Sequence, residues 1–168
     1  MLIMDSYSRL FTLLDGSDVP YRVIDHPAEG RTDVASQLRG HALEEAAKCV
    51  VIRVALSGRK RRYVIGVVPG DRRVDLEGIC ALYGGSDAAM ATRDVAERLT
   101  GCVSGAIMPF TFTDNLDLVV DPGLLRQPVM YFNAARLDRS VALSPDDYVQ
   151  VAQPRLERIA TERQVLTC

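Results

Sequence analysis

The sequence predicts an α+β domain in which a mixed, partly barrel-like β-sheet is flanked by helices. Apolar runs of strand length and amphipathic stretches of helix length are mixed without strict βαβ alternation, which argues against a doubly wound parallel fold. Two of the strands are joined by a short loop, as in an antiparallel hairpin. The chain has 168 residues, of which 48% are hydrophobic and 25% charged, enough for one substantial core. We expect a single domain over residues 1–168, with a frayed tail from about residue 161.

The N-terminal region predicts a helix followed by a strand. Apolar residues recur at helical spacing at Tyr7, Leu10, Phe11 and Leu14. A cap at Asp5 or Ser6 begins this helix, and Gly16 ends it. Residues 21–25 then form a short strand. It ends at His26, because a residue before proline disfavours helical dihedral angles.

Two short helices and a hairpin follow. A helix is expected from Thr32 to Gly40, and a shorter one over residues 42–47. The strand of residues 50–56 is expected to pair with residues 63–68 through a basic loop, which makes an antiparallel hairpin.

Two more helices precede a segment that lacks a regular pattern. Asp75 caps a helix that ends at Gly84, and Thr92 caps the next, which ends at Gly101. Residues 102–110 are too apolar for a solvated loop and too interrupted by glycine and proline for a regular strand. We therefore expect a buried loop whose backbone is accessible to a ligand.

The remaining chain is expected to be mostly extended. Residues 116–120, 129–132 and 140–143 have the composition of strands. Ser144 is an N-cap that is followed by proline at the first helical position, so a helix is expected next. Pro154 begins a final segment.

Charge and cysteine content exclude several classes of protein. A net charge of −2 and a pI of about 5.7 argue against a protein that coats DNA through charge alone. The sequence has neither a long apolar run nor a signal-peptide pattern, so we expect a cytoplasmic protein without a membrane partner. Four cysteines without C-x-x-C spacing and only two histidines predict reduced thiols and no metal site.

Lys48 is the most informative single residue. In a strand, Lys48 would open an otherwise apolar row formed by Val50, Ile52, Val54 and Leu56. Only two of the 20 basic residues are lysine, Lys48 and Lys60, so the chain uses arginine for ordinary surface charge. The ammonium group either extends from the end of the strand to water or meets a group that enters a pocket.

Other candidates for chemistry have structural alternatives. His26 could be a general base, a substrate ligand or a structural histidine, and Cys102 is expected to be a buried thiol rather than a nucleophile. The basic cluster is either solvated loop charge or a contact to phosphate, and it consists of Arg59, Lys60, Arg61 and Arg62. The sequence has no G-x-S-x-G elbow, Walker loop or dinucleotide-binding glycine motif.

Four segments occur together in a fixed order. They are Asp25-His26-Pro27-Ala28-Glu29, the lysine after Ala46-Ala47, the Thr100-Gly101 region with the G-x-x-x-P pattern of Gly105 to Pro109, and Tyr131-Phe132-Asn133-Ala134-Ala135-Arg136-Leu137-Asp138. In this order they resemble the YbaK family of free-standing aminoacyl-tRNA deacylases, related to the editing insertion of bacterial prolyl-tRNA synthetase. The similarity runs from about residue 20 to about residue 155. It is greatest to the YeaK branch, which Arg39-Gly40 also fits.

The resemblance implies hydrolysis of the ester between a wrongly attached amino acid and the tRNA 3′ end, without a cofactor. Lys48 matches the functional lysine of the family, which contacts the terminal adenosine. A loop whose backbone holds the aminoacyl group and water is matched by Gly105, Ala106, Ile107, Met108 and Pro109. Asp138 matches an aspartate near the site, where it would raise the pKa of Lys48 while burial would lower it. Asn133 replaces the serine of YbaK, so the cysteine specificity of YbaK is not expected here.

These inferences predict a trans-editing hydrolase that removes alanine, serine or threonine from mischarged tRNA. An aminoacyl ester is already activated, so positioning and oxyanion stabilisation by Lys48 and the loop can suffice without a catalytic triad. Ile107 and Met108 would line the pocket, and His26 or Asn133 would hydrogen-bond a substrate hydroxyl. The expected partners are mischarged tRNA and an aminoacyl-tRNA synthetase. The alternative is a module that binds the tRNA 3′ end or an aminoacyl ligand without hydrolysis.

Overall fold

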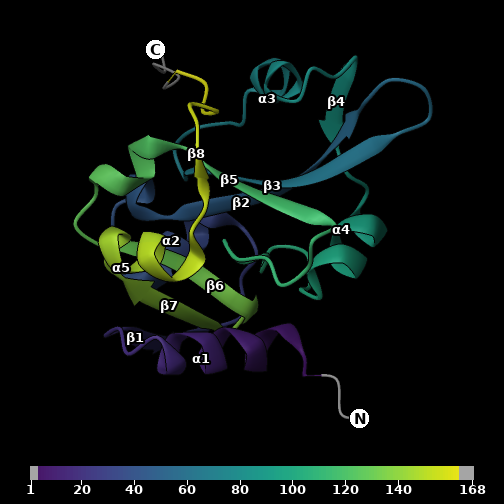
Figure 1. Cartoon of the computed structure of the whole chain (residues 1–168). Coiled ribbons are helices and arrows are strands. Elements are labelled where there is room, and N and C mark those ends of the chain that lie inside the picture. Colours follow the sequence, from purple (N-terminus) through teal and green to yellow (C-terminus); the bar gives the residue numbers. More distant parts are fainter. Residues whose placement is uncertain (1–3, 163–168) are drawn as a thin grey trace.

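The strands form two sheets (Figure 1), and the computed structural model describes residues 4–162. The three-stranded antiparallel sheet has the order β1 (Arg22–Asp25), β7 (Arg139–Leu143) and β6 (Met130–Arg136). The five-stranded sheet has the order β4 (Asp87–Met90), β2 (Ala47–Ala55), β3 (Arg61–Pro69), β5 (Leu116–Val120) and β8 (Arg155–Leu156). This second sheet is mixed, because β5 runs parallel to both β3 and β8.

Helices lie around the two sheets. They are α1 (Ser6–Gly16), α2 (Thr32–Arg39), α3 (Leu76–Leu82), α4 (Arg93–Thr100) and α5 (Pro145–Ala152), with 3-10 turns η1 (Leu43–Glu45) and η2 (Pro122–Arg126). In Figure 1, α1 runs along β1 and β7 at the bottom, and α3 lies above the five-stranded sheet. None of the helices within residues 4–162 has the length and apolar character needed to cross a bilayer.

The predicted N-caps are confirmed. Side-chain oxygens of Asp5, Asp75, Thr92 and Ser144 each accept a hydrogen bond from a backbone N–H in the first turn of α1, α3, α4 and α5. Each cap satisfies a donor that the helix itself leaves without a partner. These local contacts explain why the starts of four helices could be predicted from the sequence.

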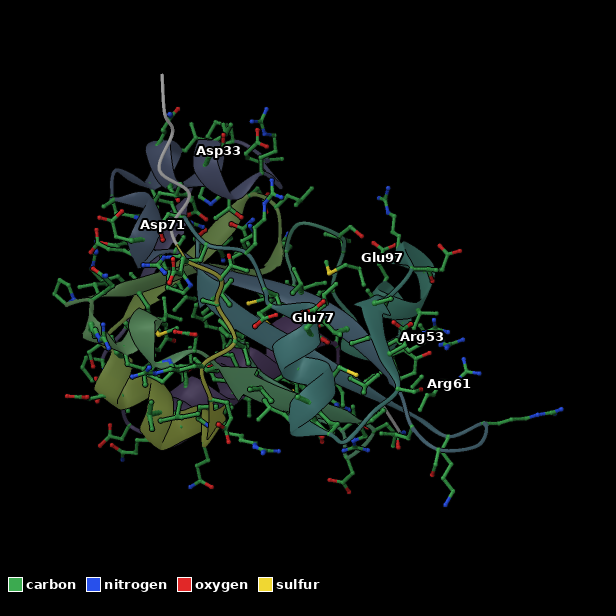
Figure 2. The ribbon with its side chains drawn as sticks, turned by 90° about the horizontal axis from the view of Figure 1, so that it is seen from above. Asp33, Arg53, Arg61, Asp71, Glu77 and Glu97 are labelled. Carbon is green, nitrogen blue, oxygen red and sulfur yellow. The ribbon has the colours of Figure 1, made fainter. Side chains whose placement is uncertain are left out.

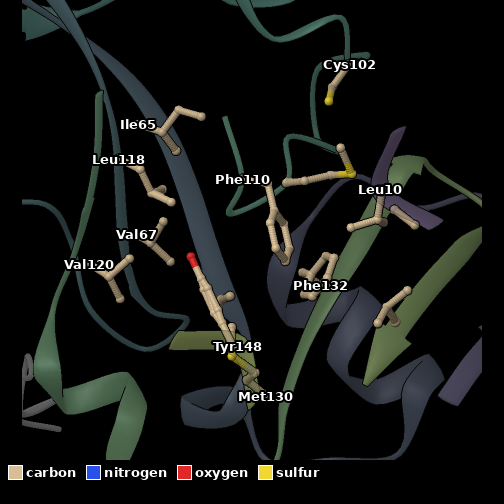
Figure 3. Packing of buried hydrophobic residues seen from close by; sticks show 14 of the residues in the cluster. Leu10, Ile65, Val67, Cys102, Phe110, Leu118, Val120, Met130, Phe132 and Tyr148 are labelled. Atoms are coloured by element: carbon tan, nitrogen blue, oxygen red, sulfur yellow. The ribbon is translucent and has the colours of Figure 1, made fainter. Parts of the chain in front are cut away.

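The larger hydrophobic core lies between the two sheets and supports the loop of residues 102–110 (Figure 3). The ring of Phe110 lies 5.7 Å from that of Phe132 and 5.3 Å from that of Tyr148, measured between centroids. The Tyr148 hydroxyl donates a hydrogen bond of 2.5 Å to the carbonyl oxygen of Pro109, and burial raises the pKa of this phenol. The aromatic cluster thus fixes the C-terminal end of the loop.

The predicted α+β class is confirmed, with three differences in detail. Over residues 4–162 the β-structure forms two sheets, joined by one bridge between Ala46 and Tyr131, so it does not close into a barrel. Strand β4 was not predicted, because alanine and aspartate have low strand propensity, and it forms by pairing with the edge of β2. The helix expected over residues 42–47 is only the short turn η1. Of the expected tail, residues 163–168 lie outside the described residues.

Candidate functional site

A cavity of about 170 Å³ lies between α2, β2, the loop of residues 102–110 and β6. Four residues that the sequence singled out line it: Lys48, Gly105, Ile107 and Asn133. Arg39 lines it as well. Among the described residues that form its wall there are two cationic side chains and no aspartate or glutamate. The cavity therefore presents positive charge to any molecule that enters it.

Lys48 stands near the start of β2 and is half-buried. Its Nζ donates a hydrogen bond of 3.0 Å to the carbonyl oxygen of Arg72, which holds the side chain against the connection between β3 and α3. Burial lowers the pKa of Lys48, and the nearby positive charge of Arg73 lowers it further. The ammonium is thus held by a neutral acceptor rather than by a carboxylate, and that acceptor belongs to Arg72, which lines a larger neighbouring cavity.

The backbone at Gly105 is fixed by close packing and by hydrogen bonds. Its φ of +88° lies in the left-handed region, and a Cβ added there would lie 2.6 Å from the Cα of Gly30. The preceding residue, Ser104, donates its backbone N–H to the carboxylate of Glu97 at 2.8 Å. Because no larger residue fits, glycine is required at position 105, and the loop is held in one conformation.

Asn133 has a different role from the predicted contact to a substrate hydroxyl. Its Nδ2 donates to the carbonyl oxygens of Glu29 and Gly105, each at 3.0 Å. Its Oδ1 is within hydrogen-bond distance of Ser140 Oγ at 2.8 Å and Arg39 Nη1 at 3.2 Å. These four contacts occupy the hydrogen-bonding capacity of a carboxamide. Asn133 therefore braces the cavity wall instead of reaching the ligand.

His26 is connected to the cavity wall by hydrogen bonds through Ser140, which contacts Arg39 and Asn133. Its Nδ1 lies 2.9 Å from the carbonyl oxygen of Pro27, and its Nε2 lies 2.7 Å from Ser140 Oγ. A carbonyl oxygen only accepts, so Nδ1 donates to Pro27, while Nε2 pairs with the Ser140 hydroxyl, whose own hydrogen is donated to Asn133 Oδ1. The histidine is not among the residues that line the cavity. This geometry supports the structural role rather than that of a general base.

Three residues of the G-x-x-x-P pattern face the core rather than the cavity. Ala106 and Met108 are 0% and 2% exposed and pack in the large hydrophobic cluster, and the carbonyl of Pro109 bonds to Tyr148. Of the side chains in this pattern, only that of Ile107 lines the cavity. The reason is that residues 106 and 108–110 anchor the loop, which leaves Gly105 and Ile107 at the wall.

Asp138 does not act on Lys48. Its side chain is 59% exposed, and its carboxylate lies 3.8 Å from Nε of Arg136 in the turn between β6 and β7. The charged neighbour that alters the pKa of Lys48 is Arg73 instead. The predicted rise of the lysine pKa by Asp138 is therefore wrong.

The basic cluster lies away from the cavity. Arg59, Lys60 and Arg61 are exposed, whereas Arg62 forms an ion pair with Asp117. In Figure 2, Arg61 lies far to the right of Asp33, which marks the first turn of α2 at the cavity. Any contact that this hairpin makes with a ligand is outside the cavity.

The described cysteines are free thiols, of which Cys102 is buried in the large hydrophobic core and Cys49 packs against it. Cys49, Cys80 and Cys102 are free within the described part of the chain, and Cys168 lies outside it. Burial raises the pKa of Cys102, which keeps it protonated at neutral pH. The structure supports the prediction of a packed thiol rather than a nucleophile.

Arg39 is the site residue that sequence reasoning missed. It ends α2, where an arginine is explained simply by the helix dipole. In the structure its Nε donates to Nε2 of His41 at 2.9 Å, and its Nη1 donates to Asn133 and Ser140. Burial lowers the pKa of Arg39 to about 10, so it remains charged at neutral pH. The only signal in the sequence was that Arg39-Gly40 fits the resemblance described above.

We expect acid to weaken the fold at His41. Its ring stacks on Tyr131 with centroids 3.7 Å apart, and its unprotonated Nε2 accepts from Arg39. Burial, together with Arg39, lowers the pKa of His41 below the usual 6.5, so the folded state keeps the neutral ring and the unfolded state binds the proton first. The contribution of His41 to the free energy of unfolding is present above pH 6.5, the usual pKa of histidine. It is lost as the pH falls through the lower pKa that His41 has in the folded state.

A His41→Phe variant keeps a stacking ring but cannot be protonated. Between about pH 7.5 and about pH 5, wild type is expected to lose more free energy of unfolding than this variant. Urea denaturation at the two pH values measures the difference. Equal losses in both proteins would show that His41 does not titrate on unfolding.

Comparison with known proteins supports a function in aminoacyl-tRNA editing. Residues 26–151 match the model of the aminoacyl-tRNA editing domain family. The chain is 39% identical over 152 residues to the multifunctional Ser/Thr-tRNA deacylase ProXp-y of Escherichia coli (strain K12), with 90% of each chain covered. It is also 28% identical over 127 residues to the proline–tRNA ligase of Corynebacterium urealyticum, covering 67% of this chain and 22% of the ligase.

Two solved structures share the fold. The hypothetical protein APE2540 superimposes with a TM-score of 0.81 and 20% identity, over 91% of this chain and 99% of the other. A proposed trans-editing enzyme for prolyl-tRNA synthetase superimposes with a TM-score of 0.78 and 21% identity, over 96% of this chain and 100% of the other. At these identities the likeness establishes the architecture alone.

Proposed function

This chain belongs to the aminoacyl-tRNA editing domain family, and we propose that it is a trans-editing hydrolase for mischarged tRNA that carries a small amino acid. Serine and threonine are the favoured amino acids, because the 39% identical relative from Escherichia coli is named a Ser/Thr-tRNA deacylase. Alanine is the third candidate. The editing domain is proposed to comprise the whole chain of 168 residues.

The observation that carries this proposal is one cavity with Lys48 and Gly105 in its wall. Its volume of about 170 Å³ suits a small acyl group, because an engineered cavity of about 150 Å³ holds benzene, with about six heavy atoms. A seryl group has six non-hydrogen atoms and a threonyl group seven. Larger aminoacyl groups exceed this volume.

The reaction is the hydrolysis of an ester. A water oxygen bonds to the carbonyl carbon, and the electron pair of the C=O π bond moves to the carbonyl oxygen. When the intermediate collapses, the bond to the ribose 3′ oxygen breaks, and this oxygen takes up the proton that water has lost. The products are the free amino acid and tRNA with a free 3′ hydroxyl. Lys48 in its charged form would bind the ribose oxygen or the developing oxyanion, while the loop positions the acyl group.

The direct test is deacylation of defined substrates by the purified protein. We expect release of the amino acid from mischarged seryl-tRNA and threonyl-tRNA at rates well above spontaneous hydrolysis, and much slower release from phenylalanyl-tRNA, whose side chain exceeds the cavity. Acid-precipitable radioactivity measures the remaining ester. Rates equal to the protein-free control with all small amino acids would contradict the proposed function.

The alternative, a non-catalytic binding module, has one observation in its favour. Of the described residues that line the cavity, none is a histidine, aspartate or glutamate that could serve as a general base. Such a module would bind seryl-tRNA saturably without hydrolysing it. The deacylation assay, run beside a filter-binding assay, separates the two functions.

We further propose where the protein acts and what it contacts. Arg59, Lys60 and Arg61 are exposed on one hairpin and free to meet the phosphates of an acceptor stem, whereas Arg62 is engaged with Asp117. The similarity to part of a proline–tRNA ligase suggests a functional link to an aminoacyl-tRNA synthetase. Both partners are components of cytoplasmic translation, so we place the protein in the cytoplasm.

A further inference from the structure

The charge of the small cavity differs from that of its larger neighbour. The neighbouring cavity, of about 510 Å³, mixes three arginines with three acidic residues: Arg72, Arg126, Arg158, Glu44, Asp71 and Asp121. The small cavity has Arg39 and Lys48 but no acidic residue among the described lining residues. Opposite charges can compensate each other in the first cavity and cannot in the second. The small cavity is therefore suited to an oxygen atom that carries or develops negative charge.

Arg39 is held so that part of its guanidinium has no partner in the protein. A guanidinium has five N–H donors, of which Nε and Nη1 donate to His41, Asn133 and Ser140. Within residues 4–162, Nη2 forms no hydrogen bond, and no carboxylate forms an ion pair with Arg39. Since the side chain lines the cavity, its remaining N–H donors are available to a ligand.

One amide connects this arginine to the loop. Asn133 Oδ1 accepts from Arg39, and Asn133 Nδ2 donates to the carbonyl oxygen of Gly105. Two opposite parts of the cavity wall are thus fixed relative to each other by a single side chain. Donors that are fixed before the substrate binds need no reorganisation during the reaction, which is the condition for effective stabilisation of an oxyanion.

We propose that Nη2 of Arg39 donates to the carbonyl oxygen of the scissile ester and, together with Lys48, stabilises the oxyanion formed when water attacks. This inference rests on the proposed function and adds a catalytic residue to it. Negative charge moves onto the carbonyl oxygen in the intermediate, so the hydrogen bond is stronger there than in the ground state. Arg39 should therefore affect kcat far more than KM.

The test compares Arg39→Ala and Arg39→Lys with wild type on mischarged seryl-tRNA. We expect kcat of Arg39→Ala to fall about 100-fold, the loss typical of one oxyanion donor, with KM changed less than about threefold. Methylguanidine in solution should restore at least about a tenth of the lost rate to Arg39→Ala, because it replaces the missing donor. Arg39→Lys keeps a cation but not the planar fork, so kcat should still fall about tenfold. Arg53→Ala, which removes an exposed arginine of β2, is the matched control.

Each outcome decides the question. The role of Arg39 is overturned if a folded Arg39→Ala variant keeps the wild-type kcat, or if methylguanidine does not reduce its loss of kcat. In both cases the proposed function stands as long as the wild-type protein is active. An inactive wild type overturns the proposed function itself. If circular dichroism shows that Arg39→Ala does not fold, the Arg39→Lys protein decides, and a wild-type kcat in that variant overturns the inference.

Discussion

A Lys48→Met protein is expected to lose activity on mischarged seryl-tRNA on the order of 1,000-fold in kcat, because it lacks the ammonium that we propose binds the ribose oxygen or the developing oxyanion. Methionine keeps an unbranched apolar stem of similar length, so packing beside Val50 at the cavity wall is retained. In the folded protein the ammonium bonds only to the carbonyl oxygen of Arg72 and has no acidic partner among the described residues. Its charge is therefore available for a ligand. Single-turnover deacylation kinetics measure the loss.

Stability separates this effect from misfolding. Burial lowers the pKa of Lys48, which means that the folded state disfavours its charged form, so removal of the charge should not destabilise the protein. Arg53→Met removes an exposed cation from the same strand and introduces the same side chain, and it should keep wild-type kcat. If Lys48→Met retained more than about a tenth of wild-type kcat, Lys48 would not be the electrostatic centre of the reaction.

The local features of the site could be predicted from the sequence, whereas its network could not. Lys48 stood out because a lysine opens an apolar strand, and Gly105 because glycine interrupts an apolar segment. The role of Asn133 depends on four partners at residues 29, 39, 105 and 140, and no local pattern brings these together. An arginine at the end of α2 has an ordinary explanation in the helix dipole, so the only signal at Arg39 was its fit to the family resemblance.

The same distinction explains the fold. Helix starts depend on one side chain and the next three residues, and the predicted caps were confirmed. Strand β4 depends on an unpaired edge of β2 that is remote in sequence, so its residues 87–90 gave no strand pattern. The loop of residues 102–110 could be recognised as buried, but which of its residues face the cavity depends on contacts to Tyr148 and Gly30.

Gly105→Ala is expected to lower both stability and activity. The added Cβ would lie 2.6 Å from Gly30 Cα and 3.1 Å from the Gly30 carbonyl oxygen, and both are backbone atoms that cannot rotate away. Left-handed strain and this overlap together should decrease the free energy of unfolding by about 3 kcal/mol. The loop would also shift relative to Lys48, and a displacement of about 1 Å can lower kcat about 100-fold.

Gly84→Ala isolates the backbone strain from the steric overlap. Gly84 has a φ of +60°, but no atom lies within 4 Å of an added Cβ, so only the conformational strain applies. We expect a loss of about 1 kcal/mol and wild-type kcat for this variant, compared with the larger losses for Gly105→Ala. Urea denaturation and deacylation kinetics of the two variants measure both quantities. Equal destabilisation by the two substitutions would mean that Gly30 can move, and that close packing against Gly30 does not fix the loop beside Lys48.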